Sequence, residues 1–337
     1  MSDTMPWLPA LRVVQAPMAG GAATPELVAA VSEAGGLGFL AAGYKTAAQM
    51  RGEIERTRGL TSRPFGVNVF MPTQDAADQA ELDAYARAIG GEARRLGAVL
   101  GTPRGGDDDF AAKVTDLLAD PPEVVGFTFG RPEDGLIQAF RGKGTAVVVT
   151  VTSAEEARLA AAADALCVQG AEAGGHRGSF TNTDRQGAGV DRLLLQVREV
   201  SRLPLIAAGG IASAEDVSRV LAGGAVAAMA GTAFLLCDES GTGAVHRAAL
   251  TDPRFTGTAL TRAFTGRPAR GLVNRFMAEY SGRAPAAYPQ VHHLTAPLRR
   301  AAAEQGDADT LHLWAGTSWN RARPAPAADV TAGLAPR

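Results

Sequence analysis

The chain has 337 residues, and its 33 basic and 35 acidic side chains leave a net charge of −2, so its charge does not favour nucleic acid or an anionic membrane as a partner. Two cysteines, Cys167 and Cys237, stand in apolar surroundings and are too few for a disulfide framework or a metal site. The N-terminus lacks a signal-peptide pattern and no apolar run approaches the roughly 20 residues of a membrane helix, so we expect a soluble, cytoplasmic protein.

Short apolar runs alternate with helix signals from the start of the chain. Leu11 to Ala16 is predicted to be a strand, and Thr24-Pro25-Glu26 then combines an N-cap, a first-turn proline and a first-turn acid. That helix should run to Ala34, where two glycines end it. The β-branched run from Thr145 to Val151 is the clearest later strand. This β-loop-α rhythm is typical of a parallel sheet flanked by helices.

The pattern contains eight such strands, each followed by a helix or an insertion. They are predicted at residues 11–16, 37–42, 64–70, 123–129, 145–151, 165–168, 203–208 and 225–230. Eight units predict a (β/α)₈ TIM barrel, with a smaller, mainly helical domain over its C-terminal face. An open doubly wound sheet is the alternative, but no G-x-G-x-x-G follows the first strand.

Three segments break the rhythm and define the domains. Residues 8–236 should form the barrel, with an insertion at about 72–106 that we expect to cover the mouth of the site. Residues 237–320, with helices near 243–251 and 296–305, should form the cap. The alanine- and proline-rich tail, residues 321–337, is predicted to be disordered.

A glycine-rich loop directly after the sixth strand carries one ionisable ring. Gln169 ends the strand, Gly174 and Gly175 allow close approach of the backbone to a ligand, and His176 follows. Imidazole titrates near neutrality and can serve as an acid or a base. We predict that the glutamine and the glycines line a cofactor and that His176 faces the substrate. A surface turn with a solvated histidine is the alternative.

The loops after the last two strands suit a phosphate. In TIM barrels, active sites lie at the carboxyl ends of the strands, and phosphates often bind after strands seven and eight. Gly209-Gly210 and Gly231-Thr232 occupy these two positions. Asn68 ends the third strand and suits the polar edge of a ring or its chain, or is a turn asparagine. Met18 can pack on a ring plane or fill the core.

The remaining histidines and the arginines after residue 260 are weaker candidates. His246 stands at helical spacing among alanines and should be at the surface, whereas His292 and His293 can reach the mouth. Several arginines between residues 262 and 275 should brace the cap. The sequence lacks the motifs of serine hydrolases, nucleoside triphosphatases and zincins.

Several motifs in order resemble nitronate monooxygenases, once called 2-nitropropane dioxygenases. They include Gln15-Ala-Pro-Met-Ala-Gly-Gly21, Pro64-Phe-Gly-Val-Asn68, the loop from Gln169 to Gly178, Ala207-Ala-Gly-Gly-Ile211 and Gly231-Thr-Ala-Phe-Leu235. Later segments, Phe264 to Phe276, Leu294 to Arg299 and Leu313 to Gly316, resemble class I members.

The resemblance implies an FMN-binding TIM barrel whose active-site histidine is His176. By motif position, the FMN contacts are Met18, Asn68, Gln169, Gly174, Gly175, Gly209, Gly210, Met229, Ala230, Gly231 and Thr232. Met229 is a departure, since many members have glutamine there. No metal is implied, and the sequence does not specify an oligomeric state.

The resemblance further implies oxidative denitrification of alkyl nitronates, such as propionate 3-nitronate, with O₂ to a carbonyl compound and nitrite. His176 could hold the negative charge of the nitronate as imidazolium, or remove the α-proton of a nitroalkane as imidazole. The alternatives are an NAD(P)H-dependent flavin reductase of the enoyl-acyl-carrier-protein or quinone type, and a non-catalytic barrel that binds a phosphorylated ligand.

Overall fold

A computed structural model describes residues 5–73, 77–183 and 187–336 and confirms the TIM barrel. Eight parallel strands form one sheet in the order β1-β9-β8-β6-β5-β4-β3-β2. Leu37 closes it, because its N–H donates to Val13 O and its carbonyl accepts from Gln15 N. The strands are β1 Val13–Gln15, β2 Gly38–Ala41, β3 Phe65–Phe70, β4 Val124–Thr128, β5 Ala146–Val151, β6 Ala165–Gln169, β8 Leu205–Ala208 and β9 Ala227–Ala230.

The strands are buried on both faces, as expected for a parallel sheet wrapped by helices. N-cap side chains start several of these helices: the Thr24 hydroxyl accepts from Leu27 N, as predicted, and the Ser213 hydroxyl accepts from Asp216 N. The surrounding helices are α1 Pro25–Glu33, α2 Ala47–Leu60, α4 Phe110–Ala119, α5 Asp134–Arg141, α6 Ala154–Leu159, α7 Val190–Arg198 and α8 Ala214–Ala222.

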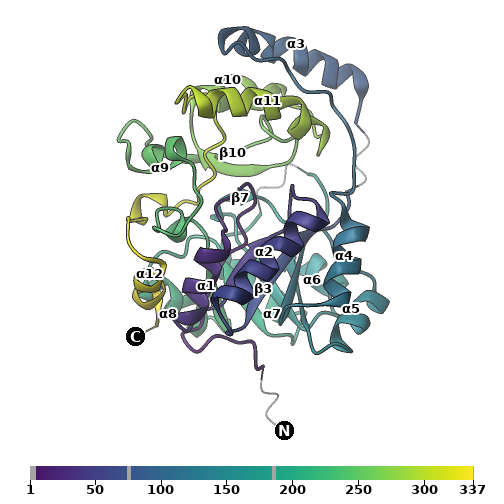
Figure 1. Ribbon diagram of the computed structural model, residues 1–337, viewed down its shortest axis with the longest axis vertical. Coiled ribbons are helices and arrows are strands. Elements are labelled where there is room, and N and C mark those ends of the chain that lie inside the picture. The colour runs from purple at the N-terminus through teal and green to yellow at the C-terminus, as the bar shows by residue number, and fades with distance from the viewer. Residues whose placement is uncertain (1–4, 74–76, 184–186, 337) are drawn as a thin grey trace.

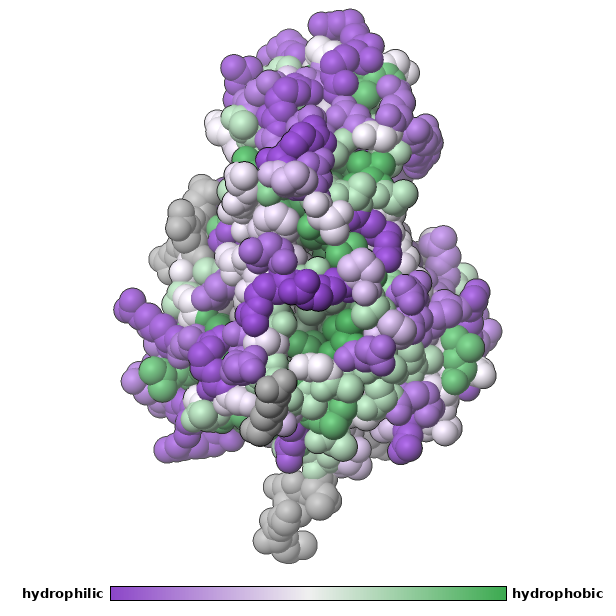
Figure 2. Space-filling model, turned by 90° about the vertical axis from the view of Figure 1, so that its left-hand side faces the viewer, coloured by the Kyte–Doolittle hydropathy of each residue, from purple (hydrophilic) through white to green (hydrophobic). Residues whose placement is uncertain are grey.

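A narrower part of the molecule, the cap, stands over the carboxyl ends of the strands (Figures 1 and 2). Its central sheet joins β10 and β11 to the two-residue strand β7, which comes from the loop after β6. The cap therefore shares a sheet with the active-site loop of the barrel. Its elements are α3 Gln79–Arg95, β7 Gly175–His176, α9 Ala244–Thr251, β10 Thr258–Thr261, β11 Ala269–Leu272, α10 Arg275–Tyr280 and α11 Gln290–Glu304.

The insertion after β3 lies in a different place from the one expected. Helix α3 is at the far end of the cap (Figure 1), where Leu82, Tyr85 and Ile89 share a hydrophobic core with residues of α10 and α11. The Tyr85 hydroxyl donates to Ala263 O at 2.6 Å. The apolar face of α3 thus packs against the cap, and the helix does not cover the opening of the site. Residues 74–76 of the insertion lie outside the described residues.

The prediction of a disordered tail is wrong. Ala327–Leu334 forms α12, which packs against α1 and α8 and buries Ala327, Thr331 and Leu334. The Ala327 N–H also donates to the Glu239 carboxylate at 2.9 Å. Alanine favours helix, and three small or apolar side chains on one face are enough to fill the groove between two helices. Arg337 lies outside the described residues. In the described ranges, none of the helices has the length and apolar character needed to cross a membrane.

Candidate active site

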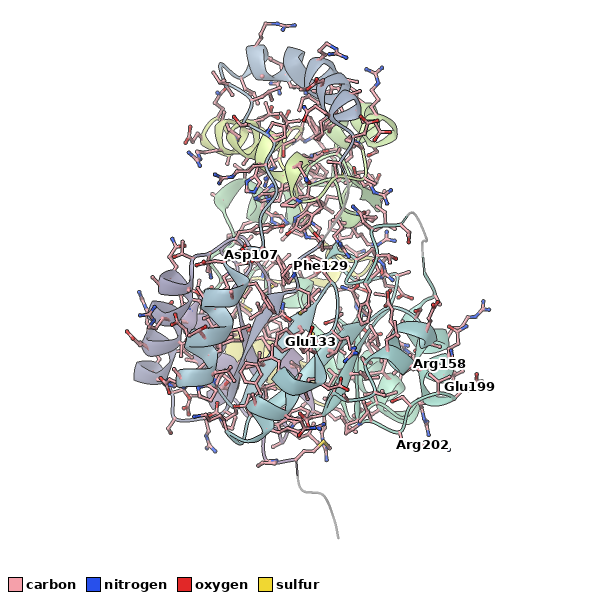
Figure 3. All side chains as sticks on the ribbon, turned by 90° about the vertical axis from the view of Figure 1, so that its right-hand side faces the viewer. Asp107, Phe129, Glu133, Arg158, Glu199 and Arg202 are labelled. Atoms are coloured by element: carbon pink, nitrogen blue, oxygen red, sulfur yellow. The ribbon has the colours of Figure 1, made fainter. Side chains whose placement is uncertain are left out.

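A cavity of about 440 Å³ opens between the strand ends and the cap, within the usual size range of ligand pockets. The parallel strands bring their carboxyl-end loops to this one face, and Phe129, just after β4, lies at the junction with the cap (Figure 3). All twelve predicted site residues line the cavity. They are Met18, Asn68, Gln169, Gly174, Gly175, His176, Gly209, Gly210, Met229, Ala230, Gly231 and Thr232.

The Gln169 side chain holds the loop that carries His176. Its Nε2 donates to His176 O at 3.0 Å, and its Oε1 accepts from Gly178 N at 2.8 Å. Gly174 allows a close approach to the segment that contains Ala315 and Gly316, because an added Cβ would lie 2.5 Å from Gly316 N. The glutamine lines the cavity, as predicted, but both its amide nitrogen and its amide oxygen already make a hydrogen bond within its own loop.

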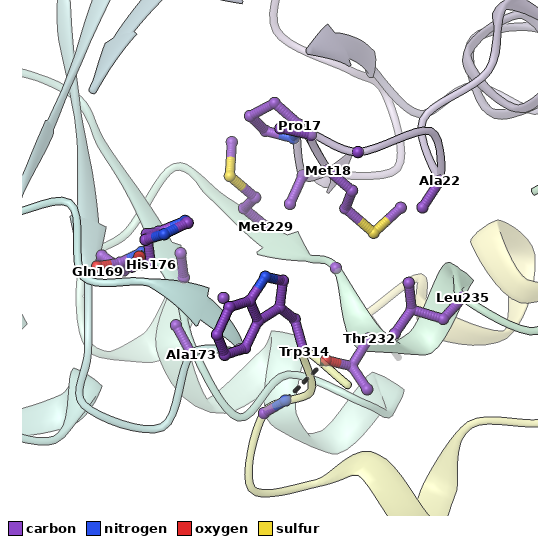
Figure 4. A pocket seen from close by; sticks show the side chains of 18 of the residues that line it. Pro17, Met18, Ala22, Gln169, Ala173, His176, Met229, Thr232, Leu235 and Trp314 are labelled. Atoms are coloured by element: carbon purple, nitrogen blue, oxygen red, sulfur yellow. Dashed lines mark hydrogen bonds between the residues drawn. The ribbon is translucent and has the colours of Figure 1, made fainter. Parts of the chain in front are cut away.

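His176 is fixed by both its backbone and its ring. In β7 it pairs with Ala269 of β11, so the cap determines its position. The ring faces the cavity beside Gln169 and Trp314 (Figure 4). Aromatic rings surround it, with centroid distances of 5.9 Å to Phe129, 5.8 Å to Tyr288 and 5.7 Å to Trp314.

This imidazole is half-buried and lines the cavity. Burial, reinforced by the positive charges of Arg267 and Arg299, lowers the pKa of His176 from its ordinary value of 6.5 to about 3. The ring is therefore neutral at physiological pH, which favours the proposed base over the imidazolium.

Thr265 contacts the imidazole and bears on its tautomer. Its Oγ1 lies 2.9 Å from His176 Nε2, and its hydroxyl can donate to Arg267 O at 3.2 Å. When the hydroxyl donates to that carbonyl, Nε2 carries the imidazole proton and donates to Oγ1. Nδ1 makes no hydrogen bond to any described residue, so it remains free to accept a proton in the cavity.

The glycine loops after β8 and β9 present unpaired backbone donors. Within the described part of the chain, the N–H groups of Gly209, Gly210 and Gly231 donate no hydrogen bond. Gly209 has φ +116°, a conformation that L side chains rarely adopt. Thr232 Oγ1 accepts from Gly316 N at 2.9 Å (dashed in Figure 4), which leaves its proton available to a ligand.

The side chains of Asn68, Met18 and Met229 complete the barrel side of the cavity. Asn68 Oδ1 accepts from Thr128 Oγ1 at 3.1 Å, while its Nδ2 donates to no described residue. Met229 lies 3.6 Å, sulfur to sulfur, from Cys167, and both line the cavity, as Met18 does. At residue 229 this chain thus presents a soft apolar side chain where its resemblance suggests an amide.

The cap contributes residues that the sequence patterns did not reveal. His246, expected at the surface, lines the cavity, and its Nε2 is buried without a partner among the described residues. His292 also reaches the cavity, whereas His293 beside it does not line it. Arg299 and His312 were not singled out at all. These cap residues are polar side chains on the inner face of a cap element. Local periodicity in the sequence cannot distinguish that face from the outer one, so it could not assign them to the cavity.

The predicted bracing role of the cap arginines agrees with their contacts. Arg270 Nε donates to Ala171 O at 2.9 Å, and Arg275 forms an ion pair with Glu92. The guanidinium of Arg267 lies 4.0 Å from the centroid of the Phe129 ring.

We expect the protein to lose stability as the pH falls below about 6.5. Burial lowers the pKa of four cavity histidines, to about 3 for His176, 4 for His246 and 2 for His292, and well below 6.5 for His312. Below pH 6.5 the unfolded chain takes up protons that the folded state does not bind, so the free energy of unfolding falls by about 1.4 kcal/mol per histidine and pH unit. Melting temperatures between pH 7 and 5 test this. His312→Gln should make the dependence shallower, and a melting temperature independent of pH would contradict the expectation.

Comparison with known proteins identifies the relatives of this chain. The family model for nitronate monooxygenase matches residues 7–336. A probable nitronate monooxygenase of Staphylococcus aureus is 36% identical, over 96% of this chain and 92% of its own length. The solved nitroalkane oxidase from Streptomyces ansochromogenes is 54% identical, with a TM-score of 0.94 over 97% of this chain and 95% of that one. FabK from Thermotoga maritima is 26% identical, with a TM-score of 0.74 over 96% and 91%.

Proposed function

Because the chain belongs to the nitronate monooxygenase family of oxidoreductases, we propose that it uses FMN and O₂ to oxidise alkyl nitronates, such as propionate 3-nitronate. The products are a carbonyl compound and nitrite. The observation that carries the proposal is the meeting of unpaired backbone donors and a neutral histidine at one cavity. The similarity to a nitroalkane oxidase supports the same chemistry.

The donors of the barrel loops fit the phosphate of FMN. Three unpaired N–H groups, of Gly209, Gly210 and Gly231, and the free hydroxyl proton of Thr232 can together bind a dianion. Backbone dipoles of this kind need no neighbouring cation. They are therefore compatible with the shortage of basic side chains around the cavity.

The remaining predicted residues fit the flavin ring. The Asn68 amide can donate to a ring carbonyl or a ribityl oxygen, and Met18 and Met229 offer polarizable apolar surface. When bound, FMN supplies the electron transfer and the reaction with oxygen. The protein supplies placement, exclusion of water and proton handling.

His176 is the residue placed to act on the substrate. As a neutral imidazole with Nδ1 free, it can remove the α-proton of a neutral nitroalkane. Towards a nitronate, which has already lost that proton, the unprotonated Nδ1 has no hydrogen bond to donate, and the ring contributes packing. His176 is thus suited to neutral nitroalkanes as a base, whereas a nitronate reacts without that step.

Purified protein should be yellow and should release nitrite from propionate 3-nitronate in the presence of O₂. When the protein is mixed anaerobically with the nitronate, its flavin absorbance should bleach, whereas NADH should leave it unchanged. Absence of nitrite and of nitronate bleaching would contradict the proposal.

A flavin reductase is the second candidate, because the likeness to FabK extends over most of the chain. The same anaerobic experiment decides, since a reductase would be bleached by NADH and not by the nitronate. A colourless protein that takes up no FMN would instead indicate a non-catalytic barrel.

A further inference from the structure

Arg299 is a buried cation that faces the cavity without a carboxylate partner. Only 8% of its surface is exposed, and it lines the cavity from α11. No Asp or Glu of the described residues lies within ion-pair distance of its guanidinium. Burial lowers its pKa to about 10, so it remains charged at neutral pH. Burying an unpaired charge is strongly unfavourable, and a fold that tolerates it has a use for the charge.

Neutral groups hold the guanidinium in place. Nε donates to Thr295 Oγ1 at 3.1 Å, Nη2 donates to His292 Nδ1 at 3.2 Å and to His292 O at 3.1 Å, and Nη1 lies 3.5 Å from His312 Nε2. Both imidazoles are neutral and accept from the arginine. One of the five N–H groups of the guanidinium has no assigned acceptor in these contacts. The neighbours orient the cation and leave its charge uncompensated.

The two histidines are themselves fixed by aromatic rings. His292 stacks on Tyr44 with centroids 4.1 Å apart and planes 4° from parallel. Trp314 lies between His312 and His176, with centroid distances of 5.5 and 5.7 Å. Arg299 and His176 line the same cavity, linked through the rings of His312 and Trp314. A small molecule beside His176 can reach Arg299.

The described residues that line the cavity carry positive charge and no negative charge. Among the described residues that line it, Arg299 is the only lysine or arginine, and there is no aspartate or glutamate. The four histidines of the wall are neutral at physiological pH. The cavity thus presents one fixed positive charge in apolar surroundings, where electrostatic attraction is strong.

We propose that Arg299, oriented by His292 and His312, is the specificity-determining residue that binds a planar two-oxygen anion of the substrate at the cap side of the cavity. The one free N–H donates to an oxygen of such an anion, and the guanidinium, held in orientation by its other contacts, attracts the anion through its charge. The anion is either a carboxylate distal to the reacting carbon or the nitronate group itself. The identity of the substrate in this inference rests on the proposed function. The presence of an anion site beside Arg299 does not depend on that function.

The test compares Arg299→Gln with Arg300→Gln, which removes the same charge from the exposed neighbouring residue of the same helix. Steady-state kinetics use propionate 3-nitronate and a neutral-tailed nitronate, propyl-1-nitronate. We expect the Arg299 variant to raise KM for the carboxylated substrate by about 10- to 100-fold, the range for one hydrogen-bonded charge, while kcat changes little. An unchanged KM for the neutral-tailed substrate assigns the anion to the distal carboxylate, and a rise for both assigns it to the nitronate. Unchanged KM values for both overturn the proposal.

Binding of propionate to the flavin-loaded protein tests the anion site without turnover. The change in flavin absorbance or in melting temperature measures this binding. Wild type and Arg300→Gln should bind propionate with equal affinity, and Arg299→Gln should bind it at least tenfold more weakly. Equal affinities in all three proteins overturn the anion site. Arg299→Lys, which keeps the charge, should bind propionate with an affinity between those of wild type and Arg299→Gln. If Arg299→Gln does not fold, Arg299→Lys takes its place in the comparison with wild type. Failure of wild type to oxidise any nitronate contradicts the proposed function and leaves the propionate result interpretable.

Discussion

Replacing His176 with asparagine should lower nitrite release from a neutral nitroalkane by about 10²- to 10⁴-fold while the protein keeps its flavin. Asparagine retains a polar group near Thr265 and comparable bulk, but its amide neither accepts nor holds a proton at neutral pH. Most of the predicted FMN contacts, including the phosphate-binding glycines after β8 and β9, lie on other loops, so the cofactor should remain bound. Turnover of a neutral nitroalkane, which requires removal of the α-proton, should fall further than turnover of the nitronate.

His246→Asn is the matched control, because His246 also lines the cavity as a neutral, buried imidazole. It comes from α9 and not from the loop that joins the barrel to the cap. We expect this variant to keep turnover within a few-fold of wild type. Turnover of His176→Asn at the wild-type level, with flavin content and melting temperature also unchanged, would show that the imidazole has no part in the reaction.

Replacing Gly209 with alanine should weaken FMN binding by at least tenfold. At φ +116° a side chain is strained, and the added Cβ would lie 3.2 Å from Ala173 N and 3.3 Å from Gly170 O. A backbone shift of even a few tenths of an ångström would move the unpaired N–H groups of this loop away from a phosphate. A loss of about 1.4 kcal/mol corresponds to the tenfold change. Titration of the apoprotein with FMN, followed by quenching of flavin fluorescence, measures the dissociation constant.

Gly144→Ala separates backbone strain from loss of the cofactor site. Gly144 also has a positive φ, +79°, but it precedes β5 at the opposite end of the barrel, and an added Cβ would have no neighbour within 4 Å. Both variants should melt at lower temperature than wild type, and only the Gly209 variant should bind FMN more weakly. Equal dissociation constants for the two would remove the loop after β8 from the predicted phosphate site.

Local patterns in the sequence were enough to predict the barrel and the cavity residues that the barrel contributes. Helix caps such as Thr24 and the β-branched run of β5 act within a few residues, so they can be recognised without the fold. Once eight β/α units are recognised, topology brings every strand end to the same face. This is why Asn68, Gln169 and Gly231 could be assigned to one cavity although they are far apart in the chain.

The cap depended on contacts that no local pattern encodes. Strand β7 has two residues and exists only because it pairs with β11, almost a hundred residues later. Helix α12 is ordered because a groove between α1 and α8 receives it. Arg299 and Arg300 are adjacent and chemically identical, and only the packing of α11 turns one towards the cavity and the other towards solvent. The sequence alone therefore determined where the cofactor should lie, since strand ends converge by topology, whereas tertiary packing decided which charge meets the substrate.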